Sequence, residues 1–284
     1  MITRVGRGPL VRTRDTLFLI TLHAIPAVAI IRGTSSSDWI ACVMSYVVIA
    51  MSTGVGLHRY FAHRAFRTSR VFQCFLAVLA CTSFVDPIGF AGKHRLHHRH
   101  ADRDADVHSP RQGFWYCWLG SLIDDGYSDR EILSMASDWR RFPELMWLHH
   151  WFWIPAVALG GVTWWIGGFS MFAMCFCLSR VLLLHLISTV NFFCHFAGTR
   201  RFATADASTN NMVVALLTFG EGWHNNHHRH PRSARAGLRW WEIDPVWYVI
   251  KLLAWIGLVW NVREAPAPRL AAKDHHRVLW LGSS

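Results

Sequence analysis

Residues 220–230 read GEGWHNNHHRH, and the HxxHH spacing of His224, His227 and His228 is repeated by HRLHH at residues 94–98. Two shorter clusters, HRYFAH at residues 58–63 and NFFCH at residues 191–195, lie elsewhere in the chain. Neutral imidazole nitrogens are good ligands for iron, zinc, copper or nickel. The nine histidines are too many for one ion and suit two. The four clusters therefore predict a two-metal site, and they decide how the apolar segments between them must be arranged.

Four apolar segments approach the roughly 20 residues that a helix needs to cross the hydrocarbon of a bilayer. They are residues 16–31, 39–57, 147–166 and 169–190. Pro26 and Pro155 lie within them, and proline is tolerated in membrane-spanning helices. The connections at residues 32–38 and 167–168 are short. The sequence therefore predicts two transmembrane helical hairpins.

Two further apolar stretches are shorter, at residues 71–85 and 246–260. If residues 71–85 crossed the membrane, the cluster at 58–63 would face the opposite side from the cluster at 94–98. We therefore expect both stretches to be helices at the membrane interface or packed on the cap. Lysine and arginine are concentrated outside the hairpin tips, which places all four clusters on the cytosolic side.

The predicted fold class is an all-α membrane protein with four transmembrane helices and a helical cytosolic cap that holds a di-metal histidine site. The predicted parts are a cytosolic segment at 1–15, hairpins at 16–57 and 147–190, cap segments at 58–146 and 191–263, and a loose tail at 264–284. Residues 1–12 are also expected to be loose. A less favoured alternative is a signal peptide over residues 1–31, with a cleavage-like Ala27-Val28-Ala29.

Composition supports this class. Hydrophobic residues make up 52% of the 284 residues, and the chain has 16 tryptophans, which favour the headgroup level of a membrane. The net charge of +11 accompanies long apolar runs, so an anionic membrane surface or substrate is expected rather than nucleic acid. The seven cysteines form no CxxC pair, which indicates neither a disulfide framework nor a cysteine metal site.

Helical spacing predicts how the ligands are presented. Residues three and four apart share a helix face, so each HxxHH motif projects its histidines together, as do Asn191 and His195. His58 and His63 are five apart, about 140° around a regular helix of 3.6 residues per turn. Either the helix ends between them or each serves a different metal, and the second interpretation is favoured.

Nearby carboxylates could orient the histidine rings by accepting their free N–H groups. Asp106 and Glu221 are the preferred candidates, and Asp102, Asp104 and Asp206 are further ones. Asn191 is a poorer ligand than histidine and is expected to bind through a water. The other histidines of the spans and motif flanks are expected to be packed, hydrogen-bonded or solvated, namely His23, His100, His108, His149, His150, His185 and His230.

These motifs resemble those of the membrane fatty acyl desaturases, of the stearoyl-CoA Δ9 desaturase type and its bacterial relatives. The resemblance runs from about Trp39 to Trp241, and GEGWHNNHHRHP is its most specific motif. It implies a cap that holds two Fe(2+) ions and an O2-dependent reaction that introduces a cis double bond into a saturated acyl-CoA or acyl-lipid. The ligands it implies are His58, His63, His94, His97, His98, His195, His224, His227 and His228, with Asn191 on a water.

The resemblance also implies a separate electron donor, either a ferredoxin or a cytochrome b5-like carrier, and an integral, multi-pass location in a bacterial inner membrane. Relatives often carry tryptophan where this chain has Phe90, which leaves chain length and double-bond position open. Arg140, Arg141, Arg200 and Arg201 are expected to hold a phosphate headgroup, or to contact anionic lipid. A di-iron hydroxylase or alkane monooxygenase is the alternative enzyme, and a membrane metal transporter is the alternative of another class.

Overall fold

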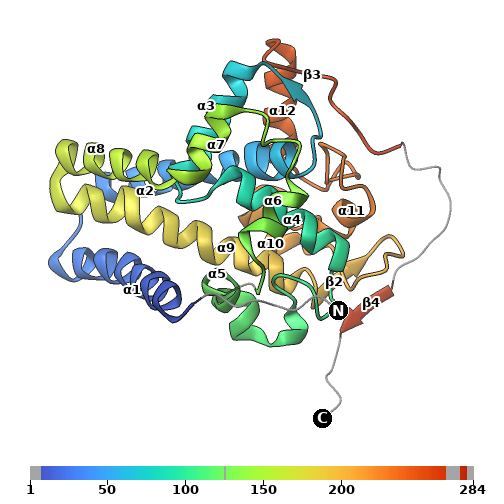
Figure 1. The fold of residues 1–284 in the computed structure, drawn as a ribbon, viewed down its shortest axis with the longest axis horizontal. Coiled ribbons are helices and arrows are strands. Elements are labelled where there is room, and N and C mark those ends of the chain that lie inside the picture. Colours follow the sequence, from blue (N-terminus) through green and yellow to red (C-terminus); the bar gives the residue numbers. More distant parts are fainter. Residues whose placement is uncertain (1–7, 125, 267–275, 280–284) are drawn as a thin grey trace.

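The computed structural model describes residues 8–124, 126–266 and 276–279, and this part of the chain is mostly helical (Figure 1). In chain order the elements are α1 (Pro9–Arg32), α2 (Ser36–Met51), η1 (Ser52–Ala62), β1 (Arg67–Thr68), α3 (Arg70–Cys81), α4 (Pro87–His100), η2 (Pro110–Gln112), η3 (Tyr116–Gly120), α5 (Ser121–Ile123), α6 (Asp129–Met135), α7 (Pro143–His150), α8 (Trp153–Met171), η4 (Phe172–Leu178), α9 (Ser179–Phe193), β2 (Ala197–Arg200), α10 (Met212–Leu217), α11 (His224–Arg229), α12 (Pro245–Trp255), β3 (Val259–Trp260) and β4 (His276–Leu279).

In the described part of the chain, three helical stretches are long and apolar enough to cross a membrane. They are Pro9–Arg32, Ser36–Ala62 and Trp153–Phe193. The third, with 41 residues, is not one straight rod, because Gly167 and Gly168 have non-helical backbone angles. Gly168 has a φ of 63°, which glycine adopts at little cost. Figure 1 shows α8 and α9 running back along each other from this break, beside α1 and α2.

The helix ends differ from the predicted boundaries. The first helix begins at Pro9, so the prediction that residues 1–12 are loose is wrong for Pro9 onward. Proline at the first helical position is favourable because its fixed φ suits the helix. The third apolar helix begins at Trp153 and not at Trp147, since α7 ends at His150 and Trp151 leaves the helical region. Residues 1–7 lie outside the described residues.

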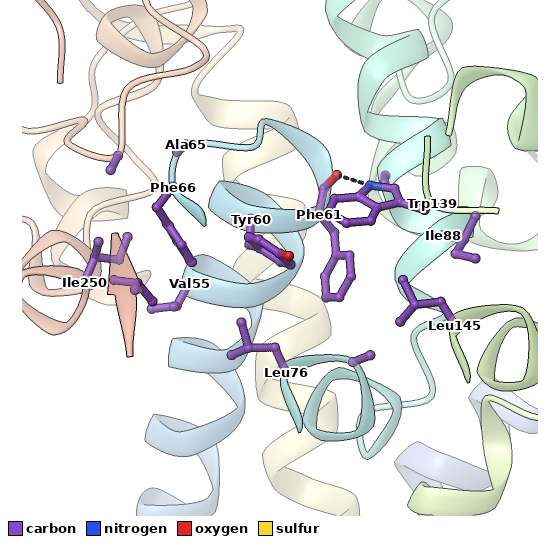
Figure 2. Packing of buried hydrophobic residues seen from close by; sticks show 14 of the residues in the cluster. Val55, Tyr60, Phe61, Ala65, Phe66, Leu76, Ile88, Trp139, Leu145 and Ile250 are labelled. Carbon is purple, nitrogen blue, oxygen red and sulfur yellow. Dashed lines mark hydrogen bonds between the residues drawn. The ribbon is translucent and has the colours of Figure 1, made fainter. Parts of the chain in front are cut away.

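The two short apolar stretches form α3 and α12, of 12 and 11 residues, and neither is long enough to be a candidate span. Both pack against η1. Figure 2 shows Leu76 of α3 and Ile250 of α12 on different sides of η1. Tyr60 and Phe61 of η1 lie between these residues and Trp139. The Trp139 indole donates a 2.8 Å hydrogen bond to the Phe61 carbonyl, which fixes the end of η1 in the cap.

The strands are short, and each pair joins two segments that are far apart in the chain. β1 pairs antiparallel with β3, and β2 pairs antiparallel with β4. The second pairing contradicts the prediction of a wholly loose tail over 264–284, because the backbone of His276–Leu279 is held on Ala197–Arg200. The remaining tail residues 267–275 and 280–284 lie outside the described residues.

Candidate metal centre

The nine predicted histidines come together in two adjacent groups. His58, His63, His94, His98 and His227 form one group, and His97, His195, His224 and His228 form the other. Within each group the nitrogens that could bind a metal all lie within 4.8 Å of one another. We call these the five-histidine group and the four-histidine group. They bring together η1, α4, the turn after α9, and α11.

His58 and His63 belong to the same group, so the prediction that they serve different metals is wrong. The reason is local. Residues 52–62 are wound as a π-helix, and the His63 amide donates to the His58 carbonyl five residues earlier, at 3.2 Å. In a π-helix, residues five apart share a face, which a regular α-helix does not allow. π-helical turns are frequent at functional sites.

Each HxxHH motif divides its histidines between the two groups. In α4, His94 and His98 point to the five-histidine group, and His97 points to the four-histidine group. In α11 the division is reversed, with His224 and His228 in the four-histidine group and His227 in the other. In each motif the two histidines four residues apart belong to one group, and the histidine between them belongs to the other group. The two helices therefore hold two ion positions side by side.

The histidines meet through their Nε2 atoms. In the five-histidine group the Nε2–Nε2 distances are 3.0 Å for His58–His227, 2.8 Å for His63–His94 and 2.9 Å for His98–His227. In the four-histidine group they are 3.0 Å for His195–His224 and 2.9 Å for His224–His228. Two nitrogens each about 2.1 Å from one ion, at right angles, would be about 3.0 Å apart. The spacing fits a shared cation.

Four buried or nearly buried carboxylates contact the Nδ1 atoms of four of the nine histidine rings. Asp106 accepts from Nδ1 of His97 at 2.9 Å, Asp102 from His195 at 3.0 Å, and Asp206 from His228 at 2.9 Å. Glu221 contacts Nδ1 of His58. A proton on Nδ1 leaves the Nε2 lone pair free. Bare lone pairs facing each other would repel, and a cation between them would remove this repulsion, so the donor set suits a metal ion.

Asp106 and Glu221, which the sequence ranked highest, contact histidine rings, and so do Asp102 and Asp206, which it ranked lower. Asp102 is 93 residues from its histidine in the chain, and only the folded cap brings the two together. Asp206 lies in a polar loop whose side chains gave no periodic signal. In both cases, the position of the carboxylate along the chain did not show which histidine it contacts.

Burial keeps most of the rings neutral. Desolvation, followed by the proximity of the other rings, holds the pKa of His63, His94, His98, His224, His227 and His228 well below the ordinary value. Burial also lowers the pKa of His97, but Asp106 outweighs this effect and raises it. Neutral imidazole is the form that binds metals.

Glu221 also belongs to a buried charge network that the sequence did not reveal. Its Oε1 accepts from Arg59 at 3.0 Å, and Arg59 is fully buried. Arg59 also lies 3.6 Å from the carboxylate of Asp244, which caps α12. Burial raises the pKa of Glu221, but His58 and Arg59 outweigh this and hold it at about 2. The network ties η1 and α12 to the five-histidine group.

The remaining predicted residues lie around this centre. Asn191 is in the last turn of α9, four residues before His195, and is partly buried. The His108 ring lies tilted against His97, with ring centroids 4.2 Å apart. Phe90 stacks on His94, with ring centroids 5.6 Å apart. Arg201 lies 3.5 Å from Glu242, and Arg200 bonds Thr204.

Two cavities are described on the cap. One, of about 390 Å³, is lined by His63 and His98 of the five-histidine group together with arginines. The other, of about 660 Å³, includes Arg141, while Arg140, Arg200 and Arg201 line neither of the two.

Fold and site together define a mostly helical protein with apolar helices and a paired histidine centre able to hold metal ions. Residues 37–262 match the family model for fatty acid desaturases. The chain is 36% identical to the icosanoyl-CoA 5-desaturase of Limnanthes douglasii, over 92% of this chain and 76% of that protein. It is 35% identical to the sn-1 stearoyl-lipid 9-desaturase of Anabaena variabilis, over 93% of this chain and 98% of that protein. The Delta-9 acyl-lipid desaturase 2 of Arabidopsis thaliana is 33% identical, over 88% and 83%.

The chain belongs to the fatty acid desaturase family and is an oxidoreductase. This finding excludes the metal transporter that the sequence left as an alternative of another class.

Proposed function

We propose that this protein is an O2-dependent desaturase that introduces a cis double bond, at Δ9, into a saturated long-chain acyl group carried by CoA or a lipid. The observation that carries the proposal is the convergence of nine histidines in two adjacent groups, with carboxylates behind four of the rings. The similarity to a stearoyl-lipid 9-desaturase over 98% of that protein supports the Δ9 position and a lipid substrate.

The proposed ligands of two Fe(2+) ions are His58, His63, His94, His98 and His227 for one ion, and His97, His195, His224 and His228 for the other, with Asn191 bound through a water. Two ferrous ions would supply the redox chemistry with O2 that breaking an unactivated C–H bond requires. The role of the protein is positional. Asp102, Asp106, Asp206 and Glu221 hold the Nδ1 protons, so that each Nε2 remains a ligand.

The proposed reaction balances with an external reductant. The acyl chain loses two hydrogens, and O2 takes these together with two electrons and two protons to give two waters. The electrons come from a separate protein, a ferredoxin or a cytochrome b5-like carrier. The same first step could lead to hydroxylation, so the product is the decisive measurement.

The proposed setting is a bacterial inner membrane crossed four times. The break at Gly167-Gly168 supports this proposal, because two crossings on either side of it would return the nine proposed histidine ligands to the cytosolic side. The basic side chains Arg140, Arg141, Arg200 and Arg201 are proposed to contact phosphate groups of the acyl carrier or of anionic lipid.

The test is expression in a host that lacks unsaturated fatty acids, with mass spectrometric mapping of any new double bond. We expect a monounsaturated product from the wild-type protein and none from His227→Ala, with both proteins inserted in the membrane. His150→Ala is the matched control, because His150 is exposed and bonds only the Met146 carbonyl among the described residues. A product that gains oxygen and keeps its hydrogens would overturn the proposal.

A further inference from the structure

A basic cavity of about 660 Å³ lies on the cap, apart from the histidine groups. It is lined by residues of η1, β1, α3 and β3 and of the loop after α6. The lining residues are Tyr60, Arg64, Phe66, Arg67, Thr68, Arg70, Gln73, Trp139, Arg141, Phe142, Trp260, Asn261 and Arg263. We call it the five-arginine cavity. None of the nine histidines lines it, so the metal centre does not explain it.

The positive charge of this cavity is only partly balanced. Arg70 pairs with Glu144 at 2.7 Å, and Arg64 bonds Asp138 at 2.5 Å. The side chains of Arg67, Arg141 and Arg263 have no acidic partner among the described residues. Like charges that line one cavity repel unless an anion sits between them. The cavity therefore favours an anionic ligand.

Gln73 adds a buried hydrogen-bond donor to the cavity lining. Its side chain is 3% exposed, and its Oε1 accepts from the Tyr60 hydroxyl at 2.8 Å. Its Nε2 is buried and finds no acceptor among the described residues. A buried amide donor without a partner is costly, so such groups are normally satisfied. An oxygen-rich anion in the cavity would satisfy Gln73 and the free guanidinium groups together, as a phosphate does.

Two helices next to the cavity lining each carry an exposed apolar stripe. On α3, Val71, Phe75 and Val78 are exposed at a spacing that places them on one face. The neighbouring residues Arg70 and Gln73 of the same helix line the cavity. An apolar face with cationic groups beside it is typical of a helix lying at the surface of a membrane.

α12 repeats the pattern on another side of η1. Tyr248, Leu252 and Trp255 are exposed at the same spacing, with Lys251 beside them. This helix leads directly into Trp260 of β3, which lines the cavity. Tryptophan at 84% exposure, as for Trp255, is typical of the headgroup level of a membrane.

We propose that the five-arginine cavity binds the phosphate headgroup of an anionic phospholipid whose acyl chains lie along the stripes of α3 and α12. Arg67, Arg141 and Arg263 would neutralise the phosphate, and Gln73 would donate to one of its oxygens. This lipid belongs to the surrounding bilayer and is not the substrate. For Arg141 it deepens the proposed function, because it selects anionic lipid over the acyl carrier as the source of the phosphate, and the other cavity residues extend it. Charge on the headgroup, rather than the acyl chains, determines binding.

Native mass spectrometry of the purified, delipidated protein tests this directly. The probes are phosphatidylglycerol and phosphatidylcholine with identical acyl chains, and no substrate is present. We expect wild type to retain one phosphatidylglycerol under conditions that remove phosphatidylcholine. Each lost charge-assisted hydrogen bond should weaken binding by roughly tenfold. The double variant Arg67→Gln/Arg141→Gln should therefore retain the two lipids equally.

Both arginines are exposed, so the double variant is expected to fold. Arg130→Gln, at an exposed site on α6, is the matched control and should bind as wild type does. Gln73→Glu should also reduce phosphatidylglycerol retention, because it opposes phosphate with a carboxylate. Equal retention of both lipids by wild type, or undiminished preference in the double variant, would overturn the proposal. So would binding of inorganic phosphate with no preference for the anionic lipid. Desaturation is not measured, so the two proposals fail independently.

Discussion

The substitution Asp206→Asn should lower the metal affinity of the four-histidine group and leave that of the five-histidine group unchanged. The carboxylate of Asp206 has two tasks. Oδ2 accepts from Nδ1 of His228 at 2.9 Å, while Oδ1 accepts from the Ser208 amide at 3.0 Å and the Thr204 hydroxyl at 2.8 Å. An asparagine has one oxygen and one NH2, so it can satisfy only one side.

If the oxygen faces Ser208 and Thr204, the NH2 meets Nδ1 of His228. The ring must then move its proton to Nε2, which ends its use as a ligand. If the oxygen faces His228, the NH2 meets the Ser208 amide, and the loop that carries residue 206 is destabilised. Loss of such a partner typically reduces metal affinity by about 10- to 100-fold. This corresponds to about 1.4 to 2.7 kcal/mol.

The effect should fall on the four-histidine group, because Asp206 contacts no ring of the other group. Iron bound per chain, measured after equilibration with increasing chelator, should fall in two steps in the variant, with one ion lost early. Asp129→Asn, at an exposed position in the first turn of α6, is the control and should leave the profile unchanged. Parallel loss of both ions, or a profile identical to wild type, would refute the reasoning.

Two further predictions concern stability. Gly92→Ala should destabilise the fold by about 1–3 kcal/mol, because the new Cβ would lie 2.3 Å from the Ile132 carbonyl oxygen. Gly161→Ala is the control and should not destabilise the fold, because no heavy atom lies within 4 Å of its Cβ position. Unfolding midpoints in detergent would measure both, and equal midpoints would contradict the packing of α4 on α6. The hydrogen bond that His149 donates to the Asp86 carboxylate raises the pKa of His149, and partial burial opposes this effect. The stabilisation from the His149–Asp86 ion pair is therefore complete below about pH 6.5, the ordinary pKa of histidine, and is lost as pH rises through the raised pKa of the folded protein. The deficit of His149→Gln relative to wild type should be larger at about pH 6 than at about pH 9; a deficit that does not change with pH would show that the ion pair is not the cause.

The sequence alone determined which residues gather and in what kind of body. The histidine motifs and the long apolar stretches are local patterns, and the short stretches at 71–85 and 246–260 did become helices too short to be candidate spans. Such patterns survive folding because helix spacing and hydrophobic length are properties of the chain itself. The Gly167-Gly168 connection was likewise readable, since glycine permits the backbone angles found there.

Only the tertiary structure decided how the ligands are divided. No pattern in HRYFAH predicts a π-helix, because the i→i+5 hydrogen bond of a π-helix differs little in energy from the i→i+4 bond of an α-helix. Here η1 packs against α3, α4 and α12, and this packing selects the π-helical form. The pairing of Asp102 with His195, and the division of each HxxHH motif between two groups, depend on contacts between segments far apart in the chain. Those contacts depend on how helices pack in three dimensions, which spacing along one helix does not specify.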